Sequence, residues 1–99
     1  MNMQALMREA QKMQKELQKT QKELEDTIYE GSSSLVFVKM NGKKELVSVE
    51  IKNDGEFRSD DLEMLEDMII VAVNDAGKKV DKDNESKLSK YGNNISGLM

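Results

Sequence analysis

The first 24 residues carry one continuous heptad repeat, and no other feature of this sequence constrains the fold as strongly. Mostly apolar side chains recur at alternating spacings of three and four residues, the pattern of a coiled-coil seam or of a helix packed lengthwise on a partner. The seam positions are Met3, Leu6, Ala10, Met13, Leu17, Thr20 and Leu24. Because the segment lacks Gly and Pro and is rich in helix formers, we predict a helix over residues 2–25, roughly 35 Å long. Such a helix either projects from a domain of this size or pairs with another subunit.

The charged residues of this helix follow the same repeat. Glu9, Glu16 and Glu23 flank the seam on one side. Cations occupy the outer face at spacings of 4-3-4-3, and they are Arg8, Lys12, Lys15, Lys19 and Lys22. Such a row is either the solvated face of a coiled coil or a row of phosphate contacts, which need regularly spaced cations. No aromatic residue interrupts it, which argues against base stacking with single strands or RNA.

Composition excludes most catalytic and metal chemistry. The chain contains no Cys and no His, so it lacks thiolate nucleophiles, zinc–thiolate sites and the commonest general base. The serines at 32–34 have neither a base nor the glycines of a nucleophile elbow. Glu63, Glu66 and Asp67 lie where a helix dipole favours acids and lack calcium-loop spacing. We therefore predict that the protein is not an enzyme and uses no metal, cofactor or small-molecule substrate.

Charge is distributed unevenly along the chain, whose net charge is −4. Residues 1–24 carry five basic and three acidic side chains, whereas the rest carries ten basic and sixteen acidic ones. Because salt screens charges beyond about 8–10 Å, the local sign of a face governs its approach to a polyanion. No apolar stretch resembles a signal peptide or approaches the roughly 18–20 residues of a membrane span, so we expect a cytoplasmic protein without a membrane partner.

The middle of the chain predicts a small antiparallel sheet over about residues 26–52. Residues 26–31 are β-tolerant and are predicted to form a first strand, and Gly31 to Ser34 form a loop by composition. Two β-rich runs, 35–40 and 45–51, flank Asn41-Gly42, a strong hairpin signal because both residues tolerate positive φ. One face of this hairpin is expected to pack on helices. Its residues are Val36, Val38, Met40, Val47, Val49 and Ile51.

A turn signal at 53–55 precedes a second amphipathic helix, expected over about residues 60–88, in which Gly77 costs about 1 kcal/mol of helix stability relative to Ala.

The fold class predicted is α+β, in the order α-β-β-β-α: a two-layer α/β arrangement with a long N-terminal helix and a small antiparallel sheet packed against helices. Residues 1–90 form one domain, and 91–99 are expected to form a flexible C-terminal tail. Two one-sided apolar faces in so short a chain indicate that oligomerisation supplies part of the stability.

In this order and spacing the segments resemble the YbaB/EbfC family of bacterial nucleoid-associated DNA-binding proteins. The resemblance extends from Met1 to about Lys82, and its strongest stretches are Met3–Lys15, Val36–Gly42, Val47–Ile51, Leu62–Met68 and Ala72–Ala76. The chain departs from the family where three serines follow Gly31 in a loop that is usually glycine-rich. It departs again at Gly77, where a helix former is usual.

The resemblance implies a homodimer with projecting, tweezer-like helices that binds double-stranded DNA with little sequence preference and acts in nucleoid organisation or gene regulation. On this chain it implies DNA contacts at Arg8, Lys12, Lys15 and Lys19, and Lys22 continues the row. We predict phosphate contacts at these five residues and a dimer held by the seam and the sheet. The dimer residues predicted are Met3, Leu6, Ala10, Met13, Leu17, Leu24, Val36 and Val38.

An interaction module is the alternative function. A helix–hairpin–helix protein, loosely like a prefoldin subunit, would hold a protein client between helical arms. Its mark would be apolar residues near the arm tip, which Met3, Leu6 and Met7 partly supply.

Overall fold

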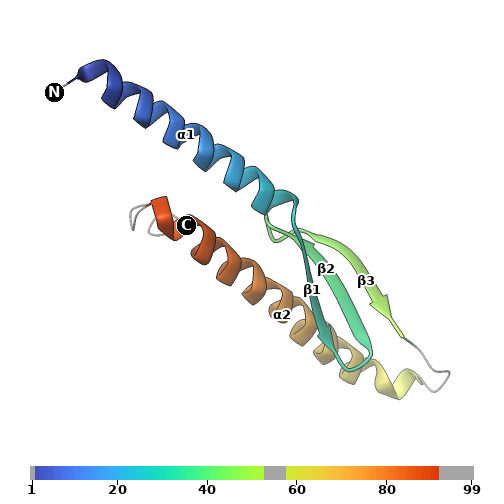
Figure 1. The fold of residues 1–99 in the computed structure, drawn as a ribbon. Helices are drawn as coiled ribbons and strands as arrows, with labels where there is room; N and C mark the ends of the chain where they lie inside the picture. The colour runs from blue at the N-terminus through green and yellow to red at the C-terminus, as the bar shows by residue number, and fades with distance from the viewer. Residues whose placement is uncertain (1, 53–57, 92–99) are drawn as a thin grey trace.

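The computed structural model describes residues 2–52 and 58–91, and these residues confirm the α+β class and the predicted order of elements (Figure 1). The elements are α1 (Met3–Asp26), β1 (Ile28–Ser33), β2 (Val36–Asn41), β3 (Leu46–Ile51) and α2 (Leu62–Leu88), with single 3-10 turns at Ser59–Asp61 and Ser89–Tyr91 on either side of α2. The predicted turn at 53–55 and the predicted tail, apart from Tyr91, lie outside the described residues.

The three strands form one antiparallel sheet in the order β1-β2-β3, and α2 packs across β1 and β2. Alternate residues of β2 are buried and face this helix, as the period of two in a strand requires. The core consists of Tyr29, Val36, Val38, Met40, Ala72, Ala76 and Val80. Two alanines in this set keep the helix close to the strands, so the core is thin and most of its contacts involve β1 and β2.

Gly31, Ser32 and Ser33 are part of β1, so the predicted first strand extends two residues past Gly31 and the predicted loop at Gly31–Ser34 is confirmed only at Ser34. Gly31 pairs with Val38, and the chain reverses after Ser33, where Ser34 has a φ of 50°. Gly31 is needed for a different reason: a Cβ there would lie 2.6 Å from the Ala76 nitrogen. The small residues of this segment therefore mark the closest approach of a strand to a helix, a tertiary contact that turn statistics do not register.

The hairpin between β2 and β3 forms as predicted, but Gly42 is not the residue with positive φ. The Asn41 carbonyl accepts from Lys44 N–H at 3.0 Å, Asn41 N–H donates to the Glu45 carbonyl at 3.0 Å, and Lys44 has a φ of 64°. This is a three-residue loop ending in the left-handed region rather than a two-residue turn. Gly42 is required because a Cβ on it would overlap the Leu24 carbonyl of α1.

β3 is not covered by a helix, which contradicts the prediction that its apolar face packs on helices within the subunit. All six of its residues are exposed, and Val49 retains 48% and Ile51 40% of its surface. Val49 lies opposite Val38 and Ile51 opposite Val36, so the face was assigned correctly. One helix is too narrow to cover three strands, and α2 lies over the other two.

The molecule is elongated, with extents of 72 × 20 × 14 Å and a radius of gyration of 19.5 Å, against roughly 13 Å for a compact chain of this length. The cause is α1, which leaves the sheet as a rod. Residues 2–16 are all exposed, whereas the Thr20 hydroxyl contacts that of Tyr91 in the 3-10 turn that follows α2. Figure 1 shows α1 and the C-terminal half of α2 extending from the sheet toward the same end.

Candidate nucleic-acid interface

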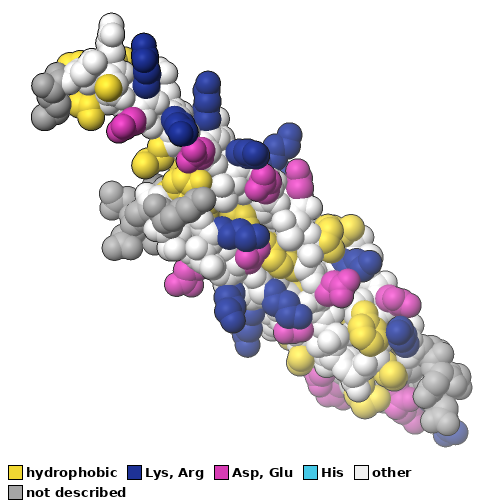
Figure 2. Space-filling model, viewed as in Figure 1, with side chains coloured by type: hydrophobic (Ala, Val, Ile, Leu, Met, Phe, Trp, Pro, Cys, Tyr) yellow, Lys and Arg dark blue, Asp and Glu magenta, His cyan; other side chains and the backbone are white. Residues whose placement is uncertain are grey.

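The five predicted cations lie on one exposed face of α1. At 100° per residue, positions 8, 12, 15, 19 and 22 fall within an arc of about 80° on the side opposite the seam. All five side chains are exposed, and Figure 2 shows Lys and Arg along the edge of the molecule formed by α1. From Arg8 to Lys22 the row is roughly 21 Å long, about six base-pair steps of B-form DNA.

Several lysines elsewhere in the described residues pair with carboxylates, whereas the five cations of α1 do not. Among the residues that the structure describes, none of the five makes an ion pair or a side-chain hydrogen bond. By contrast, ion pairs join Lys44 to Asp81 at 2.8 Å and Lys87 to Asp83 at 3.2 Å. Glu16 and Glu23 lie four residues after Lys12 and Lys19 on the same helix, but within the described residues no ion pair joins them to the row. The charge of the row is therefore available to an external anion.

Contacts at the C-terminal end of α1 hold this row in place. Leu24 is 3% exposed and lies with Leu88 around a shared hollow, and Gly42 N–H donates to the Glu25 carbonyl at 3.1 Å. One turn higher, the hydroxyls of Thr20 and Tyr91 lie 3.1 Å apart. These contacts anchor the base of the helix to the hairpin and to the end of α2. The cation-bearing part beyond them projects as an arm.

A tyrosine–carboxylate pair ties the sheet to α2 beneath this anchor. The Tyr29 hydroxyl donates to Asp83 Oδ2 at 2.5 Å. Burial, and then the bond to Asp83, raise the pKa of Tyr29 to about 12. The same hydrogen bond, assisted by Lys87, lowers the pKa of Asp83. The neutral phenol and the ionised carboxylate are therefore the favoured forms, and the pair serves structure rather than proton transfer.

The predicted dimer residues fall into three groups by exposure. Leu24, Val36 and Val38 lie inside the subunit, with at most 3% of their surface exposed, so they offer a partner almost nothing. Leu17 is half-buried. The remaining four are exposed along the arm, and they are Met3, Leu6, Ala10 and Met13. The seam thus packs within the subunit at its base and is uncovered toward the N-terminus.

An apolar trough beside β3 was not identified from the sequence. This name denotes the exposed apolar residues of the uncovered β3 face, including Val49 and Ile51, together with those of α2, where Ile70 is 57% and Leu62 56% exposed. The helical period puts Ile70 on the same side of α2 as Val73, which lines a hollow with Met40. The apolar run at 69–71 is the sequence signal for this surface, because three adjacent helical residues cannot all face one sheet and at least one of them must stay exposed.

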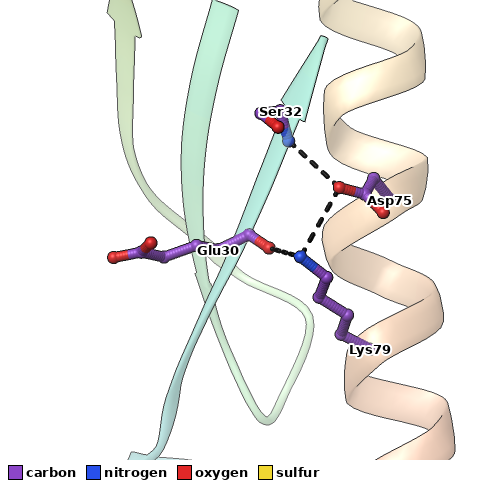
Figure 3. A network of polar contacts seen from close by, with 4 residues as sticks. All are labelled: Glu30, Ser32, Asp75 and Lys79. Carbon is purple, nitrogen blue, oxygen red and sulfur yellow. Dashed lines mark hydrogen bonds and ion pairs between the residues drawn. The ribbon is translucent and has the colours of Figure 1, made fainter.

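The two edges of the sheet differ in a way that bears on this trough. At the β1 edge, Asp75 accepts from Ser32 N–H at 3.1 Å and Lys79 donates to the Glu30 carbonyl at 2.7 Å (Figure 3). Lys79 and Asp75 also pair with each other at 3.6 Å. Side chains of α2 therefore cap the backbone groups of β1. Within the described residues, β3 has no such cap, and it is the edge open to another strand.

Two kinds of site are missing from the part of the chain that the structure describes. No group of three or more acidic side chains is arranged to hold a metal ion. No helix in that part is long and apolar enough to cross a bilayer.

The sequence comparisons agree on one family, and a structural comparison finds the same fold. The model of the YbaB/EbfC DNA-binding family matches residues 1–95. A nucleoid-associated protein of Ligilactobacillus salivarius is 41% identical over 99% of this chain and 95% of its own length, and one of Chloroflexus aurantiacus is 40% identical over 99% of both. The crystal structure of an uncharacterized Helicobacter pylori protein superposes with a TM-score of 0.72 at 26% identity, covering 93% of this chain and 99% of that one.

Proposed function

Because the chain belongs to the YbaB/EbfC DNA-binding family, we propose that it binds double-stranded DNA as a homodimer, through phosphate contacts made by the cationic face of α1. The family is one of nucleoid-associated, non-enzymatic DNA-binding proteins. Binding carried by phosphates tolerates any base sequence, which suits a role in nucleoid organisation. Gene regulation at particular promoters would require further contacts to base edges.

The observation that carries this proposal is the row of five cations on a projecting helix, none of which pairs with a carboxylate in the part of the chain that the structure describes. A polyanion gains most from cations that have no carboxylate to displace. The row lies on the face of α1 turned away from the subunit, so a duplex can approach it without contacting the acidic remainder of the chain. The residues proposed to contact phosphates are Arg8, Lys12, Lys15, Lys19 and Lys22.

The apolar trough supports the dimer and favours one arrangement of it. Monomeric proteins rarely leave a contiguous apolar patch beside an open strand edge, because both invite association. In the proposed dimer, β3 and the flanking side of α2 meet the same surface of a second copy, burying Val49, Ile51 and Ile70. The exposed seam residues of α1 stay candidates for a secondary contact between arms. Two arms projecting from one dimer would engage one duplex together.

The experiment is a binding series on duplexes of unrelated sequence at several salt concentrations. If the two subunits neutralise about five phosphates, log K falls against log salt with a slope of about −4 to −5. The variant Lys12→Glu/Lys15→Glu should weaken binding about equally for every duplex. Both positions are exposed, so circular dichroism should show an unchanged fold.

The matched control is Lys78→Glu/Lys82→Glu, which changes the net charge equally on exposed positions of α2. Lys79 is unsuitable because it caps β1. The control variant should retain most of its affinity and its salt slope. If the α1 variant folds and binds like the unmodified protein, the row is not the DNA contact. If only the control loses binding, the contact lies on α2 instead.

A protein client held by the arms remains the alternative. It draws on Met3, Leu6 and Met7, which are exposed at the arm tip. Family membership favours DNA over this reading. The same variant distinguishes DNA binding from client binding, because charge reversal at Lys12 and Lys15 would weaken DNA binding and leave an apolar client contact intact.

A further inference from the structure

The two sides of the cationic row on α1 differ in chemistry. At 100° per residue, Gln4 and Gln11 lie about 40° and about 60° from the centre of the row on one side. Glu9 and Glu16 lie about 100° and about 80° from it on the other side. Along the exposed part of the arm, residues 2–16, the row therefore has amides beside it and carboxylates farther around the helix.

This asymmetry decides which side of the arm meets a duplex together with the cations. Carboxylates repel phosphates, and within the described residues neither Glu9 nor Glu16 is neutralised by an ion pair. A Gln amide carries no charge and can both donate and accept hydrogen bonds. The favoured approach therefore tilts the arm toward its Gln side and leaves the Glu side in solvent.

The amides of Gln4 and Gln11 are suited to contact base edges. Both side chains are exposed, and in the described part of the chain neither makes a hydrogen bond. Asn2 caps the first turn by accepting from the Gln4 main-chain N–H at 3.0 Å, so the helix holds Gln4 in line with the row. In the major groove a Gln amide matches adenine, donating to N7 and accepting from the N6 amino group.

The size and spacing of the arm fit the major groove. A helix with its side chains is about 10–12 Å wide, and the groove is about 12 Å wide. Gln4 and Gln11 are seven residues apart, about 10.5 Å along the helix, against about 10.2 Å for three base-pair steps. Gln18 continues the series but lies about 80° from the centre of the row, close to where Thr20 meets Tyr91, and is not included.

We propose that Gln4 and Gln11 read adenines three base pairs apart in the major groove, while Arg8, Lys12 and Lys15 contact the phosphates beside it. This inference rests on the proposed DNA binding through α1 and adds a sequence preference to it. The preference should be about tenfold for the two residues together, because a bidentate amide–adenine contact discriminates between bases but a long exposed side chain loses entropy when it is fixed.

The affinities of matched duplexes of about 20 base pairs test this reading. A duplex of the repeat A-C-C has adenines three base pairs apart, and the unmodified protein should bind it about tenfold more tightly than the repeat G-C-C. The repeat A-C holds more adenine but never at this spacing, so it should bind more weakly than A-C-C. Replacing the adenines of A-C-C by 7-deaza-adenine removes the N7 acceptor and should abolish the preference.

The variant Gln4→Ala/Gln11→Ala should lose the preference and keep the salt slope, because the replaced side chains are neutral. The matched control is Gln14→Ala/Gln21→Ala, which changes the same residue type at the same interval about 120–140° from the centre of the row. It should keep the preference. All four positions are exposed and Ala favours the helix, so circular dichroism should show the same fold in both variants.

The possible failures separate this inference from the proposed function. Equal binding of all the duplexes by the unmodified protein, with the salt slope of phosphate contacts, would overturn the reading by Gln4 and Gln11 and leave DNA binding through α1 in place. A preference that survives in Gln4→Ala/Gln11→Ala or in 7-deaza-adenine, or that the control loses equally, would also overturn it. Unchanged binding by Lys12→Glu/Lys15→Glu would exclude the cationic row, and this inference with it.

Discussion

Gly31 gives the sharpest test of how the sheet and α2 are held together. In Gly31→Ala the new Cβ would lie 2.6 Å from the Ala76 nitrogen and 2.9 Å from the Ala76 Cβ, and it would overlap the Ala72 carbonyl oxygen. Most of these obstacles are backbone atoms, so no rotamer change relieves them. Since ordinary contact begins near 3.4 Å, β1 and α2 must separate by at least 0.8 Å at this point.

The cost follows from what that separation disturbs. Ala72, Ala76 and Val80 are fully buried in the same contact, and the bonds of Asp75 and Lys79 to the β1 backbone cross it. Overpacking of a tight core costs about 1–3 kcal/mol, and an immovable helix backbone favours the upper end. We therefore expect a loss of about 3 kcal/mol in unfolding free energy, which lowers Tm by roughly 15 °C in a domain of this size.

Gly77→Ala is the matched control, because a Cβ at Gly77 would meet nothing within 4 Å. There the same substitution should stabilise the protein by about 0.5–1 kcal/mol, since Gly is the poorer helix former. The assay is thermal and urea unfolding followed by circular dichroism, at one protein concentration because the proposed dimerisation would couple Tm to concentration. If Gly31→Ala melts with or above the unmodified protein, the described contact between β1 and α2 is wrong.

Two further predictions concern the trough and the tyrosine pair. Val49→Asp should convert the proposed dimer, of twice 11.3 kDa, into a monomer in light scattering, because burying an unpaired carboxylate in the interface costs several kcal/mol. The control Ser48→Asp, on the other face of β3, should stay dimeric. A dimeric Val49→Asp protein would exclude this surface as the interface. Tyr29→Phe should lose about 1 kcal/mol near neutral pH through the missing bond to Asp83. The raised pKa of Tyr29 means that its contribution is full below pH 10 and is lost as pH rises toward about 12, so urea melts of the two proteins should converge over that range. The lowered pKa of Asp83 means that its contribution is present above about pH 4 and is lost on further acidification; a stability difference independent of pH would contradict both assignments.

Local pattern predicted the elements of this fold because each is determined by short-range spacing. The heptad over the first 24 residues gave α1 to within one residue at each end, since nothing in the segment competes with a helix. The hairpin followed from two β-rich runs around Asn41-Gly42. Gly31 was assigned to a loop because its role, a close approach to Ala76, depends on a residue 45 positions away.

The candidate site likewise has features that the sequence predicts and features that it does not. Helical periodicity alone grouped the five cations on one face, so their alignment was visible in the sequence. Their lack of acidic partners was not, because it depends on side-chain directions in the folded arm. The seam was identified as one continuous interface, but tertiary contacts divide it: the end of α2 covers Leu24, while Leu6 and Met13 remain exposed.

The sequence by itself determined the class of the protein, its order of elements and the sign of its exposed helix face, because spacing and charge are properties of the chain read along its length. Only the tertiary structure decided which apolar faces are left for a partner. One helix covers two strands of three, so Val36 and Val38 became core while Val49 and Ile51, on the same face, became surface. A pattern of side chains states that a face must be covered; how wide the covering helix is, and where it lies, decides what is left open.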